Sequence, residues 1–148
     1  MNGRVDIDTV RDAFSRLGLI FAAEALAEAL NDAVKEELPP HTVVNRLLTV
    51  ELERREERRI RTALKLSGLP PGMTLGNFDF SFQPSIERSR IETLSTCAFV
   101  RQRETILIQG PPGTGKTHLS VALGVKAVEN GFSVAFYTLD ALLHAARR

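Results

Sequence analysis

The fold of this chain is decided by the stretch Gly110-Pro111-Pro112-Gly113-Thr114-Gly115-Lys116-Thr117, which satisfies the pattern G-x-x-x-x-G-K-[ST]. The short apolar run 106–108 precedes this stretch, and sequence of helical composition follows it from about residue 115 to residue 130. The pattern therefore lies between a predicted strand and a predicted helix, which is where a phosphate-binding loop needs it. A glycine-rich turn with an incidental lysine is the alternative, but about 1% or fewer of chains of this length would match by chance.

The residue types of the loop indicate a nucleoside triphosphate, most simply ATP with Mg²⁺. We expect the glycines at 110, 113 and 115 to adopt positive φ and to turn successive N–H groups toward phosphate oxygens. Lys116 supplies a cation to the β- and γ-phosphates, and the Thr117 hydroxyl supplies a Mg²⁺ ligand. His118 directly follows Thr117, and a surface or packing role fits it better than contact with the ligand. The predicted nucleotide-binding residues are Gly110, Pro111, Pro112, Gly113, Thr114, Gly115, Lys116, Thr117 and His118.

The sequence on either side of the loop predicts an α/β fold. A second strand is expected over residues 133–137 and a further helix over 139–146, and this β-α-β-α order implies a parallel sheet. Hydrolysis would also need an acidic pair at the end of a strand. Asp140 is the one candidate, and an N-cap or first-turn role fits it better because it opens an apolar helical stretch.

The N-terminal half is predicted to be helical. Apolar spacing indicates two short helices over residues 5–37 with a break at Gly18. One long helix is expected over residues 41–66, between Pro39-Pro40 and Gly68. Another helix is expected over residues 86–101. We therefore divide the chain into an N-terminal helical domain (1–68), a connector (69–85) and the first part of a nucleotide-binding core (86–148).

The connector is rich in proline and glycine and carries Phe78, Phe80 and Phe82 at alternate positions. These rings are expected to anchor it to the core, with a wall for the adenine base as the alternative.

Composition narrows the compartment and the partners. The chain has 148 residues, of which 43% are hydrophobic and 25% charged, and a net charge of +1, so any surface for a polyanion must be local. The single cysteine, Cys97, is expected to be a buried core thiol. The first residues, 1–8, lack an apolar signal region, and no run of 18 apolar residues occurs, which predicts a cytoplasmic protein that does not span a membrane.

A basic stripe is predicted on the long helix. Arg54, Arg58, Arg61 and Lys65 follow one another at spacings of four, three and four residues, so they share one helix face and could track a nucleic-acid backbone. Arg55 and Arg59 are expected beside this stripe. The alternative is an ordinary solvated face on which these residues pair with neighbouring glutamates.

The residues around the loop resemble the IstB-like ATPases, helper proteins of insertion-sequence transposition within the AAA+ class, related to DnaC-type helicase loaders. The resemblance is carried by the loop followed by His118-Leu119, by segments 122–124 and 134–136, and by 77–80, 94–97 and 63–66 upstream.

The resemblance implies an N-terminal helical domain, a P-loop AAA+ core, ATP-dependent assembly on DNA, and a transposase partner, and it leaves a homo-oligomer open. In the family the core continues through an acidic Walker B strand, a sensor residue and an arginine finger. The chain stops at Arg148 before these, so the core is expected to be incomplete, its strand edges unpaired and its ATP turnover undecided. A replicative helicase loader, a P-loop phosphotransferase and an inactive fragment are the alternatives.

Overall fold

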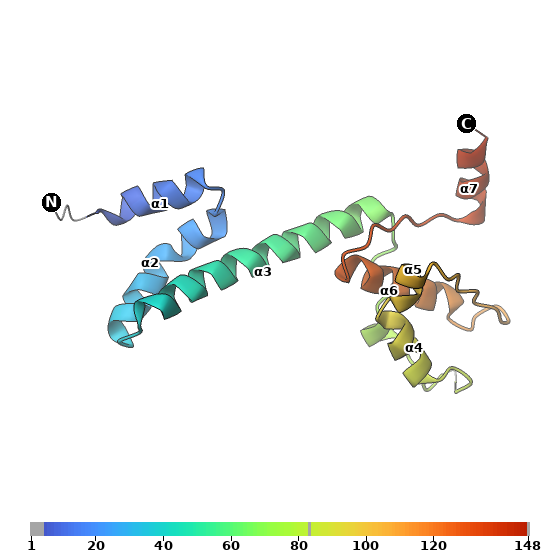
Figure 1. The fold of residues 1–148 in the computed structure, drawn as a ribbon. Helices are drawn as coiled ribbons and strands as arrows, with labels where there is room; N and C mark the ends of the chain where they lie inside the picture. The colour runs from blue at the N-terminus through green and yellow to red at the C-terminus, as the bar shows by residue number, and fades with distance from the viewer. Residues whose placement is uncertain (1–4, 83, 148) are drawn as a thin grey trace. The chain divides into compact units, whose positions relative to one another are not determined.

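The computed structural model describes residues 5–82 and 84–147, and it divides into two compact units, Met1–Arg59 and Ile60–Arg148. The helices, in chain order, are α1 (Ile7–Arg16), α2 (Ile20–Lys35), α3 (Pro40–Ser67), the 3₁₀ turn η1 (Leu75–Asn77), α4 (Arg88–Ser95), α5 (Ala98–Gln102), α6 (Lys116–Glu129) and α7 (Leu139–Ala146) (Figure 1). The domain limits 1–68, 69–85 and 86–148 remain predictions, and within them residues 1–4, 83 and 148 lie outside the described part.

The predicted break at Gly18 is confirmed. Gly18 has φ +76°, a conformation that glycine adopts without the steric penalty of a side chain. The turn is closed by the N–H of Gly18 to the carbonyl of Ser15 and by the N–H of Leu19 to the carbonyl of Phe14. This pattern ends α1 at Arg16, and α2 starts at Ile20, two residues after Gly18.

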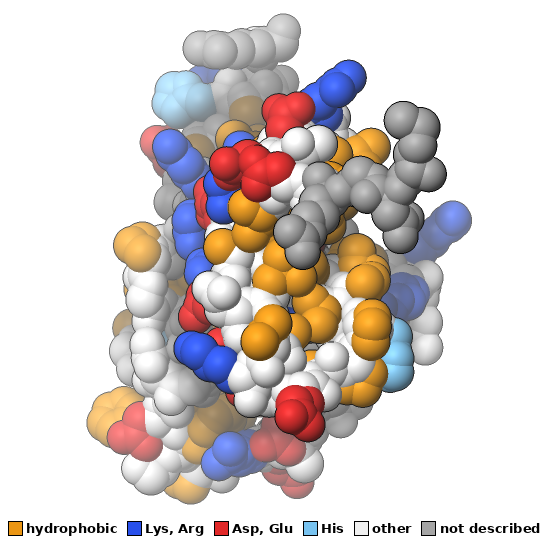
Figure 2. All heavy atoms as spheres, turned by 90° about the vertical axis from the view of Figure 1, so that its left-hand side faces the viewer, with side chains coloured by type: hydrophobic (Ala, Val, Ile, Leu, Met, Phe, Trp, Pro, Cys, Tyr) orange, Lys and Arg blue, Asp and Glu red, His pale blue; other side chains and the backbone are white. Residues whose placement is uncertain are grey.

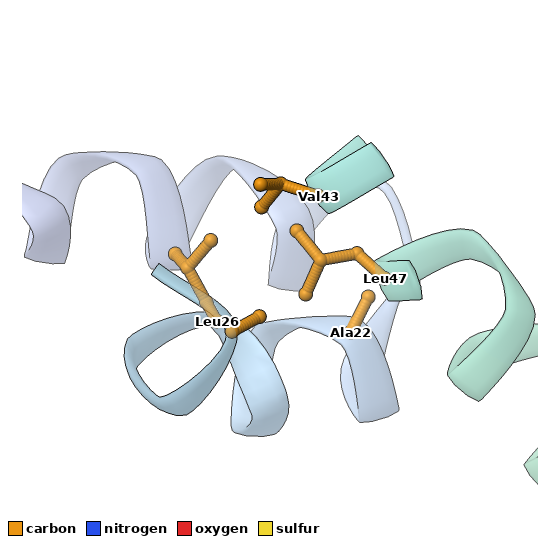
Figure 3. Close-up of a cluster of buried hydrophobic side chains, with 5 residues drawn as sticks. Ala22, Leu26, Val43 and Leu47 are labelled. Atoms are coloured by element: carbon orange, nitrogen blue, oxygen red, sulfur yellow. The ribbon is translucent and has the colours of Figure 1, made fainter. Parts of the chain in front are cut away.

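The first unit is held together by a small apolar core between α2 and α3. Figure 3 shows side chains of the two helices pointing toward one another. The buried members of this core are Ala22, Leu26, Ala29, Val43 and Leu47. Three partly buried residues of α1, Ile7, Val10 and Phe14, pack against it. The spacings of three or four residues within each helix put these residues on one helix face.

A buried carboxylate joins α3 to the start of α2. Glu51 is 3% exposed and accepts hydrogen bonds from the N–H of Ala22 (2.8 Å) and from Nε of Arg55 (2.6 Å). Arg55 also donates to the carbonyl of Gly18 (2.6 Å). Burial alone would raise the pKa of the Glu51 carboxyl, but these hydrogen bonds and the charge of Arg55 outweigh it, so the pKa is lowered from its ordinary value of 4.5.

The first unit also leaves apolar side chains in contact with solvent. Figure 2 shows hydrophobic side chains gathered on one face of the N-terminal helices, with charged groups around them. The exposed large apolar residues of this unit include Leu17, Ile20, Leu30, Val34, Val44, Leu48 and Leu52.

In the part of the chain that the structure describes, no helix is long and apolar enough to cross a membrane.

The second unit packs the connector, α4 and α6 around a second core. Phe78, Ile91 and Leu119 are its buried centre, with Leu75, Phe80, Ile86, Leu94 and Ile108 packed against them. Helix α6 is the most deeply buried element of this unit: Val121, Ala122 and Val128 are 1% exposed or less.

The two predicted strand segments lie outside the helices, but no strand is assigned among residues 5–82 and 84–147. In the segment 106–108, Ile106 and Ile108 are half-buried whereas Leu107 is 77% exposed, an alternation typical of a strand. In the segment 133–137 the N–H of Phe136 bonds to the carbonyl of Ser67. A strand is defined by ladder hydrogen bonds to a neighbour, so the predicted parallel sheet is not seen here.

The prediction of one continuous helix over residues 86–101 was wrong, because this segment forms two helices, α4 and α5. Cys97 lies at the break with φ 57°, in the left-handed region, and its N–H bonds to the carbonyl of Leu94 (3.0 Å). Its side chain is fully buried, which confirms the predicted core thiol, and burial raises the pKa of that thiol.

Candidate phosphate-binding site

Two of the three loop glycines adopt the conformation that the sequence predicted. Gly113 and Gly115 have φ +79° and +80°. Gly110 does not belong to the positive-φ group, so that part of the prediction was wrong. Its lack of a side chain matters for space, because a Cβ there would lie 3.3 Å from Oγ1 of Thr114.

The Lys116 ammonium folds back over the loop. Its Nζ donates to the carbonyl of Pro111 (2.6 Å) and lies 3.5 Å from Oγ1 of Thr114, which itself donates to the same carbonyl (2.9 Å). The loop therefore closes around its own cation. An anion entering the loop would meet a positive charge that is already held in place.

The loop leads directly into the N-terminus of α6. Gly115 is the N-cap and has no side chain that could accept a hydrogen bond from the helix. The first N–H groups of α6 are therefore donors that face the loop. Thr117, in the first turn, is exposed to solvent. One exposed hydroxyl could serve as a Mg²⁺ ligand, because Mg²⁺ takes most of its other ligands from water and from the phosphate groups of a nucleotide.

The connector contacts the helix that follows the loop. Nε2 of His118 donates to the carbonyl of Thr74 (2.8 Å), because a carbonyl oxygen only accepts. The Phe78 ring, 8% exposed, lies edge-on to the His118 ring with centroids 5.3 Å apart. A Cβ on Gly115 would lie only 2.8 Å from Cε2 of Phe78, so the ring occupies the space beside this glycine.

A cavity of about 600 Å³ opens beside the loop, within the size range of small-molecule sites. Helix α4 and the residue before it supply Ile91, Arg90 and Glu87 to its wall, and the loop side supplies Ile108 and Lys116. Sequence reasoning missed Arg90 and Glu87, since no pattern links a helix after the connector to the loop.

The connector phenylalanines divide into two roles. Phe78 and Phe80 form an edge-to-face pair with centroids 4.9 Å apart, and the Arg88 guanidinium lies 5.5 Å from the Phe80 centroid. These two rings belong to the second core, which confirms core anchoring for them. Phe82 is 70% exposed and is not among the residues of this core, so core anchoring is not seen for it.

The predicted basic side chains are all exposed on α3. Arg54 pairs with Glu57 at 3.6 Å, an exposed contact of little energetic weight, and Arg58, Arg61 and Lys65 are solvent-facing. The neighbouring Arg59 binds Glu56 through two hydrogen bonds. Arg55, which the sequence placed beside the stripe, is instead the partner of Glu51 described above.

Asp140 lies in the first turn of α7, as the simpler interpretation predicted. The N-cap is Thr138, whose side chain accepts from the N–H of Ala141 (3.3 Å). Within the described ranges 5–82 and 84–147, no three His, Cys, Asp or Glu side chains gather in a way that could hold a metal ion.

The chain is similar to known proteins over most of its length. A family model described as "IstB-like ATP binding protein" matches residues 13–148. A Pseudomonas aeruginosa protein, "Insertion sequence IS21 putative ATP-binding protein", is 41% identical over 129 residues, covering 87% of this chain and 49% of the relative. A Geobacillus stearothermophilus protein, "Insertion sequence IS5376 putative ATP-binding protein", is 36% identical over 141 residues, covering 95% of this chain and 56% of the relative.

A Bacillus thuringiensis subsp. berliner relative, "Insertion sequence IS232 putative ATP-binding protein", is 31% identical over 126 residues, which is 85% of this chain and 50% of the relative. The chain thus spans about half the length of the curated relatives it matches.

Proposed function

The chain belongs to the IstB-like ATP-binding proteins, and from this we propose that it binds ATP with Mg²⁺ through Gly110 to Thr117 and acts as a helper of insertion-sequence transposition. The names of its relatives support both parts of the proposal, since they pair ATP binding with insertion sequences. The proposed nucleotide contacts are those of the loop, with Thr117 as a Mg²⁺ ligand.

The observation that carries the proposal is the form of the loop at the start of α6. Two left-handed glycines, an N-cap without a side chain, and a lysine held over the loop together present N–H donors and a positive charge to one anion. A triphosphate matches this arrangement in charge, and the adjacent cavity has room for a nucleoside. Mg²⁺, when bound, would neutralise phosphate charge.

The test is a titration of the full chain with a fluorescent ATP analogue in the presence of Mg²⁺. Lys116→Ala removes a charge-assisted contact to phosphate, so we expect the Kd to rise by about tenfold or more. Lys126→Ala is the matched control, because Lys126 lies on the same helix and pairs with Glu129 (2.7 Å) away from the loop. Its Kd should stay within about twofold of the parent. Equal affinity in Lys116→Ala and the parent would contradict the proposal.

We also propose that the basic side chains of α3 contact DNA. Exposure of Arg54, Arg58, Arg61 and Lys65 at helical spacing supports this, as does the insertion-sequence context of the relatives. We expect the combined reversal of Arg54, Arg58 and Arg61 to Glu to lower DNA affinity and to flatten its dependence on salt.

The control for this reversal places the same charge change on exposed residues of α1 and α2: Arg11, Arg16 and Lys35 to Glu. A general electrostatic effect would weaken both triple variants alike, whereas a local α3 contact weakens only the first. DNA binding with an unchanged salt slope in the α3 variant would remove this surface from the proposal. A transposase is the proposed protein partner, to be tested by affinity pull-down against a replicative helicase.

A further inference from the structure

The connector, residues 69–85, is fastened to both sides of the two loop residues that carry the chemistry. Phe78 packs beside Gly115, immediately before Lys116, and Thr74 bonds His118, immediately after Thr117. We infer that His118 and Phe78 are positioning residues that hold the phosphate loop in its binding geometry, and that nucleotide at the loop orders the connector in return. This rests on the proposed nucleotide binding.

The hydrogen bond from His118 is specific in its direction. Because the carbonyl of Thr74 can only accept, the imidazole must carry its proton on Nε2. The bond spans 44 residues of sequence and joins the first turn of α6 to the residue that caps η1. It therefore fixes the rotation of the first turn of α6, and with it the direction of the N–H groups that face the loop.

The ring of Phe78 supplies the second constraint. It is buried, and it is edge-to-face with the rings of both Phe80 and His118. At Gly115 the ring lies where a side chain would otherwise begin. The loop cannot shift toward the connector at this point without displacing a ring that the second core holds in place.

Neither contact involves Lys116 or Thr117 directly, but the two contacts hold the residues on either side of them, Gly115 and His118. Small displacements of a group that must meet a charged ligand weaken the interaction disproportionately. If the connector stabilises the binding geometry of the loop, then ligand in the loop must stabilise the connector by the same free energy, because coupling between sites is reciprocal.

Three variants of His118 in the full chain separate its contributions. His118→Phe keeps a ring beside Phe78 and loses the donor. His118→Gln keeps an N–H donor at similar reach and loses the ring, and His118→Ala loses both. We expect His118→Phe and His118→Ala to weaken binding of the fluorescent ATP analogue with Mg²⁺ by about fivefold or more, and His118→Gln to remain within about twofold of the parent.

A second measurement begins with the unaltered chain, and this first part does not depend on the folding of any variant. Amide hydrogen exchange of residues 75–78 should slow when Mg·ATP is added, together with that of the loop. In His118→Phe the loop amides should still slow at saturating nucleotide, while the response of residues 75–78 is reduced.

The outcomes are distinguishable. Equal affinity in the parent and His118→Phe, or equal losses in His118→Phe and His118→Gln, would overturn the positioning role. Slowing confined to the loop amides would overturn the coupling to the connector. Absence of Lys116-dependent binding in the same titration would instead overturn the proposed function, and the inference with it.

Discussion

Alanine at Gly115 should destabilise the second unit more than alanine at Gly113, although the two glycines have almost the same backbone conformation. Their φ angles are +80° and +79°, so both substitutions force an L-residue into the left-handed region at a cost of about 1–2 kcal/mol. At Gly113 a Cβ would meet nothing within 4 Å. Gly113→Ala therefore measures the backbone term alone.

At Gly115 the new Cβ would also lie 2.8 Å from Cε2 and 3.3 Å from Cζ of Phe78. The ring is buried between Phe80 and His118, so it cannot rotate away without disturbing both. Overpacking of this kind costs about 1–3 kcal/mol. The sum is about 2–5 kcal/mol for Gly115→Ala, which exceeds the value for Gly113→Ala by about 1–3 kcal/mol.

Urea unfolding followed by tyrosine fluorescence measures this difference. The chain has one tyrosine, Tyr137, and no tryptophan, so the signal reports the unit that contains the loop. Adding Phe78→Leu to each glycine variant completes two double-mutant cycles, and only the cycle with Gly115→Ala should show a coupling energy of about 1–3 kcal/mol. Equal losses for the two glycines, or strictly additive effects of Phe78→Leu and Gly115→Ala, would refute the steric argument.

The further predictions concern three groups away from the loop, Glu51, Cys97 and Thr138. Glu51→Ala should lower the free energy of unfolding of the first unit by about 2–4 kcal/mol, because the N–H of Ala22 and the guanidinium of Arg55 lose a buried acceptor. Circular dichroism during denaturant unfolding measures this loss. Because the pKa of Glu51 is lowered in the folded chain, the carboxylate should stabilise the first unit fully above pH 4.5, and this stabilisation should be lost as the pH falls below that value. The same acid dependence in the parent and in Glu51→Gln would contradict this. The buried thiol of Cys97, with its raised pKa, should react with a thiol reagent at neutral pH only as fast as the unit opens, so rapid reaction of the native chain would count against its burial. Thr138→Ala should lower the free energy of unfolding by about 1 kcal/mol, because it removes the side-chain cap of α7. Unchanged helicity and stability would show that this cap does not stabilise the helix.

The sequence could predict the helices because their signals are local. Gly18 breaks α1 from α2 by its own backbone freedom, and Pro39-Pro40 and Gly68 mark the two ends of the long helix within the local sequence. The break at Cys97 was missed because a cysteine in the left-handed region has no signal in its residue type. The segments 106–108 and 133–137 have the alternation of strands, but a strand depends on a neighbour that periodicity does not specify.

The loop was found because its chemistry is contiguous in the chain, whereas its support is not. The spacing of glycine, lysine and threonine identified residues 110–117, but nothing in the sequence joined His118 to Thr74 across 44 residues. The same limit explains Arg55, which the sequence placed beside the basic stripe of the long helix. Its guanidinium is committed to Glu51 and to the carbonyl of Gly18, 37 residues away.

The Glu51–Arg55 pair also limits how this sequence can drift. A mutation at position 51 alone leaves the guanidinium of Arg55 and the N–H of Ala22 without their acceptor, and a mutation at position 55 alone leaves a buried charge without its counterion and the carbonyl of Gly18 without its donor. Each single step passes through a less stable intermediate, while an apolar pair of similar volume could be as stable as the original. Positions 51 and 55 should therefore change together in descendants of this sequence, and the turn at Gly18 should be the place that accommodates the exchange.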